Sequence, residues 1–166
     1  MNDNEKIEIE NYKKLIHACD NGDIEQVKKY LTKDNVNGLN IEGHIYVNKS
    51  PLDTALDSHK YLIVEYLLKN GANPNNYKIA YENYGFGMPI HFAIICEADF
   101  FCQEFVAEPI LTPIKMLVEY GADINAKNEK GQTPLDIAID SNHYIAENYL
   151  KSIGGKTAKE LEKENK

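Results

Sequence analysis

Apolar residues in this chain gather in short blocks, and each block is followed by a polar turn. The blocks are residues 27–31, 64–68 and 114–118. The second and third are followed by Gly-Ala and then Asn or Asp, beginning at Gly71 and Gly121. Glycine is the usual residue where a helix ends in a left-handed conformation. The pattern therefore predicts short helices that end in glycine turns.

A second pattern precedes these blocks and returns along the chain. Ser-Pro-Leu-Asp-Thr-Ala at 50–55 is followed by Met-Pro-Ile-His-Phe-Ala at 88–93 and Thr-Pro-Leu-Asp-Ile-Ala at 133–138. A degenerate copy, Leu-Ile-His-Ala, lies at 15–18. Self-similarity of this kind is typical of repeat architectures.

These segments, together with the Gly-Ala-[Asn/Asp]-x-Asn turns, resemble the ankyrin-repeat family, whose unit of about 33 residues carries a T-P-L-H-x-A signature. The resemblance implies an all-α ankyrin-repeat solenoid of antiparallel helix pairs with projecting β-hairpin loops. We expect an ankyrin-repeat domain over residues 11–156, with irregular first and last repeats that act as caps. The approximate repeats are 11–40, 41–76, 77–126 and 127–156, with an N-terminal extension at 1–10 and a charged C-terminal cap helix or tail at 157–166.

The residues around each signature favour the same helix boundaries on physical grounds. Ser50 and Thr133 each precede a proline, which suits the first position of a helix, and their hydroxyls can cap it. Asp53 and Asp136 follow three residues later, near the positive end of the helix, as in a capping box. We expect these two aspartates to be structural.

The spacing departs from the family period in two kinds of place. Asn37 to Pro51 and Asn75 to Pro89 each span 14 positions, and Asn125 to Pro134 spans 9. The first two hairpins should therefore be enlarged.

The third repeat holds a further insertion between its two helices. We expect an extended inter-helix loop from Glu97 to Thr112, with Thr112-Pro113 as a fresh cap for the second helix. The insert at 97–112 is also expected to add an extra helical turn packed on the outer helices. A second interface there is the alternative.

Composition narrows the class of function. The 166 residues include 26 acidic and 18 basic ones, a net charge of −8, and all 18 basic residues are lysine. A nucleic-acid-binding protein would normally show a basic stripe with arginine, so we expect no nucleic-acid partner. No apolar stretch approaches the roughly 18 residues that span a bilayer, and the first residues lack an apolar export signal, so we expect no membrane partner. Three cysteines without framework spacing fit a reducing compartment, which predicts a cytoplasmic protein. We also expect the protein to be a monomer on its own.

Cysteine and histidine residues offer a different class of function. His17 with Cys19, or His91 with Cys96 and Cys102, could form the site of a small Cys/His enzyme or of a metal-binding protein. Their spacing does not match zinc sites, and no positioned base accompanies a thiol. A glycine-rich phosphate loop is also missing from the sequence. We therefore expect no catalytic residue, cofactor or metal ligand.

The stronger candidates are surface residues that could bind a protein. Two positions past each signature alanine stand Asp20, Asp57, Ile95 and Asp140. Three aspartates would form an acidic strip on the concave face, complementary to a basic partner. The alternative is that they are ordinary solvated charges. The predicted contacts on this face also include Asn21, Ser58 and Ser141.

The enlarged hairpins would supply apolar and aromatic contacts beside the strip, since tyrosine offers a large contact area at low entropic cost. Packing of one hairpin on the next is the alternative. The predicted contacts are Ile41, Glu42, His44 and Tyr46 in the first hairpin, Tyr77, Tyr81, Glu82, Tyr84 and Phe86 in the second, and Glu129 in the third.

The resulting hypothesis is a non-catalytic protein–protein interaction module. Its leading form is an acidic inhibitor or immunity-type protein. Such a protein would bind and neutralise a protein partner through its concave face and long hairpins. The alternative is a secreted effector or a scaffold that binds a host protein. Family resemblance supplies the mode of binding but not the partner.

Overall fold

The computed structural model describes residues 2–39, 50–76, 87–103 and 111–164, and the side chains of α5 up to Ala98. These residues form helices and turns, and none of them lies in a strand. The helices are α1 (Asp3–Asn21), α2 (Ile24–Tyr30), α3 (Pro51–Asp57), α4 (Tyr61–Lys69), α5 (Pro89–Gln103), α6 (Thr112–Glu119), α7 (Pro134–Asp140), α8 (Tyr144–Ser152) and α9 (Ala158–Glu164). The all-α prediction is confirmed. Within the described ranges, no helix combines the length and the hydropathy that crossing a membrane requires.

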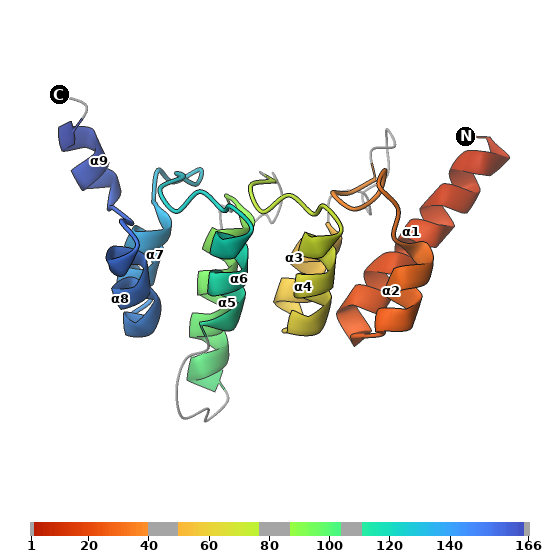
Figure 1. The fold of residues 1–166 in the computed structure, drawn as a ribbon, viewed down its shortest axis with the longest axis horizontal. Coiled ribbons are helices and arrows are strands. Elements are labelled where there is room, and N and C mark those ends of the chain that lie inside the picture. The colour runs from red at the N-terminus through yellow and green to blue at the C-terminus, as the bar shows by residue number, and fades with distance from the viewer. Residues whose placement is uncertain (1, 40–49, 77–86, 104–110, 165–166) are drawn as a thin grey trace. The chain divides into compact units, whose positions relative to one another are not determined.

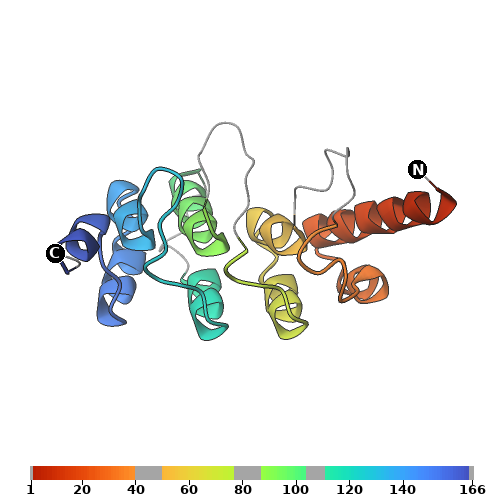
Figure 2. The ribbon, with the colours of Figure 1, turned by 90° about the horizontal axis from the view of Figure 1, so that it is seen from above.

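The chain divides into two compact units, Met1–Asn73 and Pro74–Lys166. Unit 1 contains two antiparallel helix pairs, α1 with α2 and α3 with α4 (Figure 1). Helix α1 packs on both α2 and α3, and α3 packs on α4. Seen from above, α1 and α3 form one layer of this unit and α2 and α4 the other (Figure 2). Its core includes Leu15, Val27, Leu52 and Leu67, all at most 2% exposed.

Unit 2 repeats this arrangement with α5 and α6 followed by α7 and α8. Helix α5 contacts both α6 and α7, and α7 packs on α8. Fully buried Ile90, Ile114, Leu117 and Leu150 form much of its core. Helix α9 buries no residue, in keeping with the charged C-terminal helix that the sequence predicts.

The predicted helix boundaries are mostly confirmed. The Asp53 backbone N–H donates to Ser50 Oγ (3.1 Å), and Thr133 and Asp136 form a complete capping box. Gly71 and Gly121 have φ angles of 95° and 89°, the left-handed conformation expected after a helix. The predicted enlargement of the first two hairpins falls on residues 40–49 and 77–86, outside the described residues, and stays a prediction.

Two expectations for the third repeat are wrong. Helix α5 continues through Gln103, so residues 97–103 are helical and not loop, because no glycine or proline interrupts the segment after Pro89. The extra helical turns therefore extend α5 itself (Figure 1). Thr112 does not cap α6, since the preceding Leu111 is already in the right-handed helical region and Thr112 is the first helical residue.

Asparagine side chains connect successive repeats within each unit. In unit 1, Asn37 Nδ2 donates to the Gly71 carbonyl (3.4 Å), and Asn37 Oδ1 accepts from the Asn73 backbone N–H (2.7 Å). The amide of one asparagine therefore holds a donor and an acceptor of the next turn together.

The same connection returns in unit 2 with shorter distances. Asn75 Nδ2 donates to the Gly121 carbonyl (2.8 Å), and Asn75 Oδ1 accepts from the Asp123 backbone N–H (2.7 Å). Asn125 Oδ1 accepts from the Lys156 backbone N–H (2.8 Å), so the segment before α9 occupies the place of a further turn. We refer to Asn37, Asn75 and Asn125 as the asparagine ladder.

Replacing a ladder residue should destabilise the fold. Asn75→Ala removes both hydrogen bonds, each of which contributes about 0.5–1.5 kcal/mol, and should lower the free energy of unfolding by about 1–3 kcal/mol. Urea titration followed by circular dichroism measures this change. The control is Asn70→Ala, which loses one exposed hydrogen bond to the Tyr66 carbonyl of its own helix and should cost about 1 kcal/mol or less. Equal stabilities for Asn75→Ala and the unchanged protein would contradict the role of the ladder.

Candidate functional site

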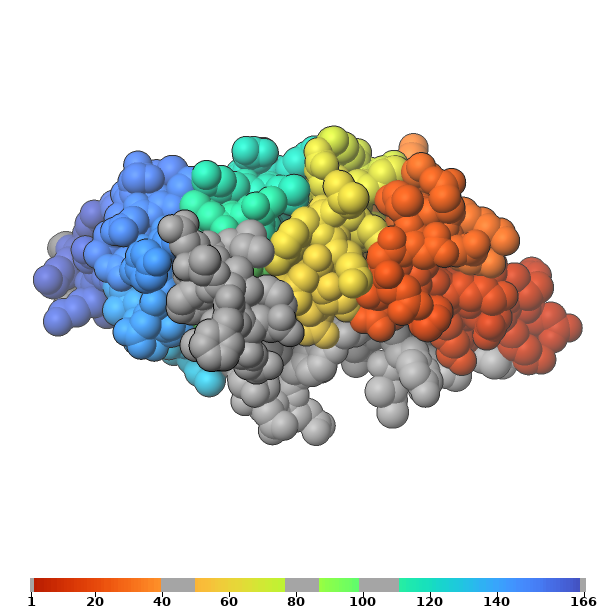
Figure 3. All heavy atoms as spheres, turned by 90° about the horizontal axis from the view of Figure 1, so that it is seen from below, coloured from red at the N-terminus to blue at the C-terminus, as the bar shows by residue number. Residues whose placement is uncertain are grey.

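Two of the three predicted aspartates lie close together in unit 1. Asp20 is in the last turn of α1 and Asp57 is the last residue of α3, and both are exposed. The Ser58 hydroxyl donates a hydrogen bond to the Asp20 carboxylate, which holds the ends of α1 and α3 together. Seen from below, the surfaces of these two helix pairs adjoin (Figure 3). We call Asp20, Asp57 and Ser58 the acidic end of unit 1.

Asn21 continues this surface along α1. Its side chain is exposed, and its Nδ2 donates to His17 Nε2 (2.8 Å). The acidic end lies at the turn between paired helices. In unit 1 the loop that begins after α2 leaves from the opposite end of the pair (Figure 1).

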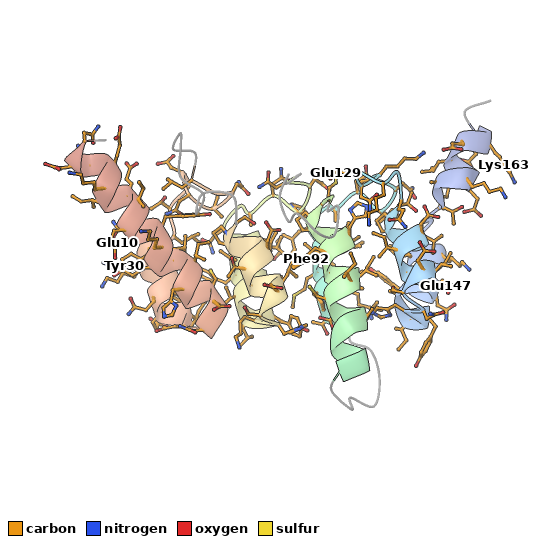
Figure 4. The ribbon with its side chains drawn as sticks, turned by 180° about the vertical axis from the view of Figure 1, so that it is seen from behind. Glu10, Tyr30, Phe92, Glu129, Glu147 and Lys163 are labelled. Carbon is orange, nitrogen blue, oxygen red and sulfur yellow. The ribbon has the colours of Figure 1, made fainter. Side chains whose placement is uncertain are left out.

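The third aspartate lies in unit 2. Asp140 ends α7, is exposed, and accepts a hydrogen bond from Gln132 Nε2 (2.7 Å). Gln132 belongs to the loop that also carries the exposed Glu129 (Figure 4), so Asp140 is linked along α7 to that loop. The hydroxyl of Ser141 donates to the Ile137 carbonyl (2.7 Å), and Ile95 on α5 is half-buried. A continuous strip through both units stays a prediction.

The position of these aspartates is unfavourable for the helices that carry them. A helix carries partial negative charge at its C-terminus, so a carboxylate there costs about 0.3–1 kcal/mol. The last turns of α1, α3 and α7 contain Asp20, Asp57 and Asp140 and no basic residue. Of the second helices, α2, α4 and α8 have lysine in their last turns, whereas α6 ends at Glu119 and has no basic residue there. In the α1–α2, α3–α4 and α7–α8 pairs, negative charge therefore lies at the end of the first helix, and the hydrogen bond from Ser58 to Asp20 offsets part of its cost in unit 1.

The contacts predicted on the two long hairpins fall on residues 40–49 and 77–86, outside the described part of the chain. They stay predictions. These residues are Ile41, Glu42, His44, Tyr46, Tyr77, Tyr81, Glu82, Tyr84 and Phe86.

His91 and Cys19, two of the candidates for a Cys/His site, have structural surroundings. The Met88 N–H donates to His91 Nδ1 (3.0 Å) and His91 Nε2 donates to the Ala126 carbonyl (3.0 Å), so backbone groups occupy both ring nitrogens. Burial raises the pKa of the Cys19 thiol to about 12, which keeps it protonated at neutral pH. In the described ranges, no three His, Cys, Asp or Glu side chains gather as metal ligands would. The side chain of Cys102 lies outside the described ones.

A surface depression in unit 1 was not predicted. It lies between α1 and α2 and has a volume of about 410 Å³. Its α1 wall consists of Lys14, His17, Ala18 and Asn21, which share one helix face by their spacing of three, four and seven. That spacing was the available signal, but only the structure shows the partner wall on α2. The α2 residues are Asp23, Gln26 and Tyr30.

Comparison with known proteins identifies the repeat. Residues 108–150 match the family model for ankyrin repeats in many copies. The chain is an ankyrin-repeat protein. This ankyrin-repeat chain is 29% identical to alpha-latrotoxin-Lg1a of Latrodectus geometricus over 165 residues, which cover 95% of the chain and 11% of that protein.

Two human relatives match shorter stretches of the ankyrin-repeat chain. Transient receptor potential cation channel subfamily A member 1 is 30% identical over 146 residues, covering 87% of the chain and 11% of the channel protein. Protein phosphatase 1 regulatory subunit 27 is 42% identical over 52 residues, covering 31% of the chain and 34% of that subunit. The chain thus spans about a tenth of the length of the first two relatives. Ankyrin repeats indicate a protein–protein interaction module.

Buried histidines should make the fold sensitive to acid. Burial lowers the pKa of both His91 and His143, so below pH 6.5 the unfolded chain binds protons that the folded chain does not. Stability should therefore fall as the pH drops below about 6.5, by up to about 1.4 kcal/mol per pH unit for each histidine. Urea titrations at pH 7.5 and pH 5.5 measure the loss.

His143→Asn is the informative variant because asparagine can replace the helix cap, in which His143 Nδ1 accepts from the Ala146 N–H (3.3 Å). It should remove roughly half of the loss between the two pH values. His17→Asn, at an exposed position, is the control and should keep the full loss. A loss of stability that His143→Asn leaves intact would refute the assignment to this histidine.

Proposed function

We propose that this ankyrin-repeat protein binds a cationic protein partner through the aspartates at the ends of its first helices. The observation that carries the proposal is the placement of Asp20, Asp57 and Asp140 in last turns that contain no basic residue. A carboxylate in that position weakens its own helix. Because these three carboxylates do not stabilise their helices, we assign them a role in binding.

A basic partner is the natural complement of these residues. The chain has a net charge of −8, which attracts a cationic protein over a distance and raises its rate of association. The exposed Asp20 and Asp57, joined through Ser58, provide two carboxylates for lysine or arginine side chains of the partner. Glu129 and Asp140 offer the corresponding groups in unit 2.

The leading form of this function is inhibition. An acidic repeat protein that covers a basic surface would neutralise a toxin or an enzyme, as an immunity-type protein does. The name of protein phosphatase 1 regulatory subunit 27, to which 52 residues are 42% identical, supports a regulatory role through binding. We propose a non-catalytic protein in the cytoplasm, a compartment that fits the thiol of Cys19.

The second candidate is an effector or scaffold that binds a host protein. It is favoured by the similarity to alpha-latrotoxin-Lg1a, a toxin by its name, over 95% of this chain. The two candidates differ in the origin of the partner, which comes from the same cell for an inhibitor and from another organism for an effector.

The isosteric variants Asp20→Asn and Asp140→Asn test the binding role. Both keep an oxygen for the hydrogen bonds from Ser58 and Gln132 and remove one negative charge each. Each should raise the free energy of unfolding by up to about 1 kcal/mol and, at low salt, weaken binding of the partner by up to about fivefold. The partner is captured from extracts of the source cell and of a host cell, identified by mass spectrometry and then titrated as a purified protein by calorimetry.

Glu25→Gln is the matched control. Glu25 is an exposed carboxylate in the first turn of α2, where negative charge is favourable, so its loss should lower stability and leave the affinity unchanged. Unchanged affinity of both aspartate variants would show that these carboxylates do not contact the partner. A partner captured only from the host extract would favour the effector.

A further inference from the structure

The depression between α1 and α2 has a small residue at its floor and larger side chains around it. Ala18 is 3% exposed and stands at the signature position of the first repeat, where only a methyl group projects between the helices. Lys14 and Tyr30 lie toward one end, and Asn21 and Asp23 lie at the turn between the helices. Asp23 caps the start of α2 and Tyr30 is its last residue, so the two are about 10 Å apart along the helix.

Positive charge gathers around Tyr30, at one end of the depression. Lys14 lines the depression, whereas Lys29 lies beside the Tyr30 ring and is not one of the lining residues. The Lys14 and Lys29 ammonium nitrogens lie 5.8 Å and 5.1 Å from the centroid of the Tyr30 ring. These are distances at which a cation interacts with an aromatic ring, so the ring helps to hold both lysines in place.

Among the described residues, the carboxylate of Glu10 approaches this end. Glu10 Oε1 is 3.7 Å from Lys14 Nζ, and the side chains of both residues are about half exposed. Glu10 and Tyr30 appear at the same edge of the α1–α2 pair (Figure 4). At that distance the ion pair is weak, and Lys14 keeps donors for a second carboxylate.

Neutral donors line the remainder of the wall. Because Asn21 Nδ2 donates to His17 Nε2, the neutral imidazole carries its proton on Nδ1 and is a donor there. The side-chain amide of Gln26 adds a further donor group to the lining. Asp23 opposes an anion, but it lies at the other end and one of its oxygens already accepts from the Gln26 backbone N–H (3.1 Å).

We propose that the depression binds a carboxylate carried on an apolar stem, as a glutamate side chain of a protein partner presents it. The carboxylate would lie at the Tyr30 end and interact with Lys14 and Lys29, while the stem would pack on Ala18 and the Tyr30 ring. The carboxylate chemistry stands by itself, and only the source of the ligand rests on the proposed function. A partner that uses both sites would carry an acidic residue beside the basic residues that meet Asp20 and Asp57.

The test uses benzoate as a probe, because it joins a carboxylate to a flat apolar body that fits the volume of the depression. Benzoate is titrated into the ¹⁵N-labelled full chain while the side-chain amide signals of Gln26 and Asn21 and the ring signals of Tyr30 are followed by NMR. We expect saturable shifts at millimolar benzoate. The affinity should fall at least tenfold in the double variant Lys14→Gln/Lys29→Gln.

Three controls separate the possible outcomes. Benzamide has the same shape without the charge and should not saturate the site, and sodium chloride at equal ionic strength should not reproduce the shifts. Lys33→Gln removes an exposed lysine that neither lines the depression, as Lys14 does, nor is placed over the Tyr30 ring, as Lys29 is. Equal shifts with benzamide would show an apolar cavity without carboxylate recognition and overturn the proposal. Unsaturable shifts that persist in the double variant would overturn it as well.

The partner titration distinguishes this inference from the proposed function. If Lys14→Gln/Lys29→Gln no longer binds benzoate and also binds the purified partner more weakly, the ligand is a carboxylate of that protein. Loss of benzoate binding with full partner affinity would overturn the partner as the source. Failure of the aspartate variants alone refutes the proposed function and leaves the benzoate result untouched.

Discussion

The asparagine ladder is the constraint on which the order of the repeats depends. Helices as short as α3 and α7, each of seven residues, have little stability alone and require packing against neighbours. Packing of apolar faces is not directional, whereas the amide of Asn75 joins a specific carbonyl at Gly121 to a specific N–H at Asp123. The amide thereby sets which turn faces which within a unit. The left-handed conformation of Gly121 contributes to this connection, because it presents the carbonyl to which Asn75 donates.

In the α1–α2, α3–α4 and α7–α8 pairs, charges in the last turns have opposite effects on the two helices. Lysines at the ends of α2, α4 and α8 stabilise those helices, and Asp20, Asp57 and Asp140 at the ends of their partners oppose the helix dipole. Negative charge therefore gathers at the ends of the first helices. In unit 1, the lysines of the α1–α2 pair create a cationic region around Tyr30, so one small unit presents groups of both signs. A partner that matches both would be selected by the arrangement of charge more than by its total.

The repeat was predictable because its signals are local. Ser50 with Pro51 and Gly121 after its helix determine helix ends through their own backbone and side-chain chemistry, and the structure confirms them. An inserted segment stays helical when no glycine or proline interrupts it. This is a negative signal, so the continuation of α5 past Glu97 escaped prediction.

The candidate site was partly predictable. The exposure of Asp20 and Asp57 follows from their position after the signature alanine. The bond from Ser58 to Asp20 and the depression above Ala18 join residues of different helices, so no local pattern reveals them.

The length of α5 shows where this architecture accommodates change. Helix α5 has 15 residues where α3 and α7 have 7, and the additional turns follow the two that correspond to the signature. A helix that grows at its far end extends along its own axis, by about 12 Å for eight residues, without altering the spacing between repeats. Insertions at this position do not change how one repeat packs on the next. Evolution could therefore vary the exit of a first helix freely, adding new surface to a repeat while the packing inherited from its ancestors stays the same.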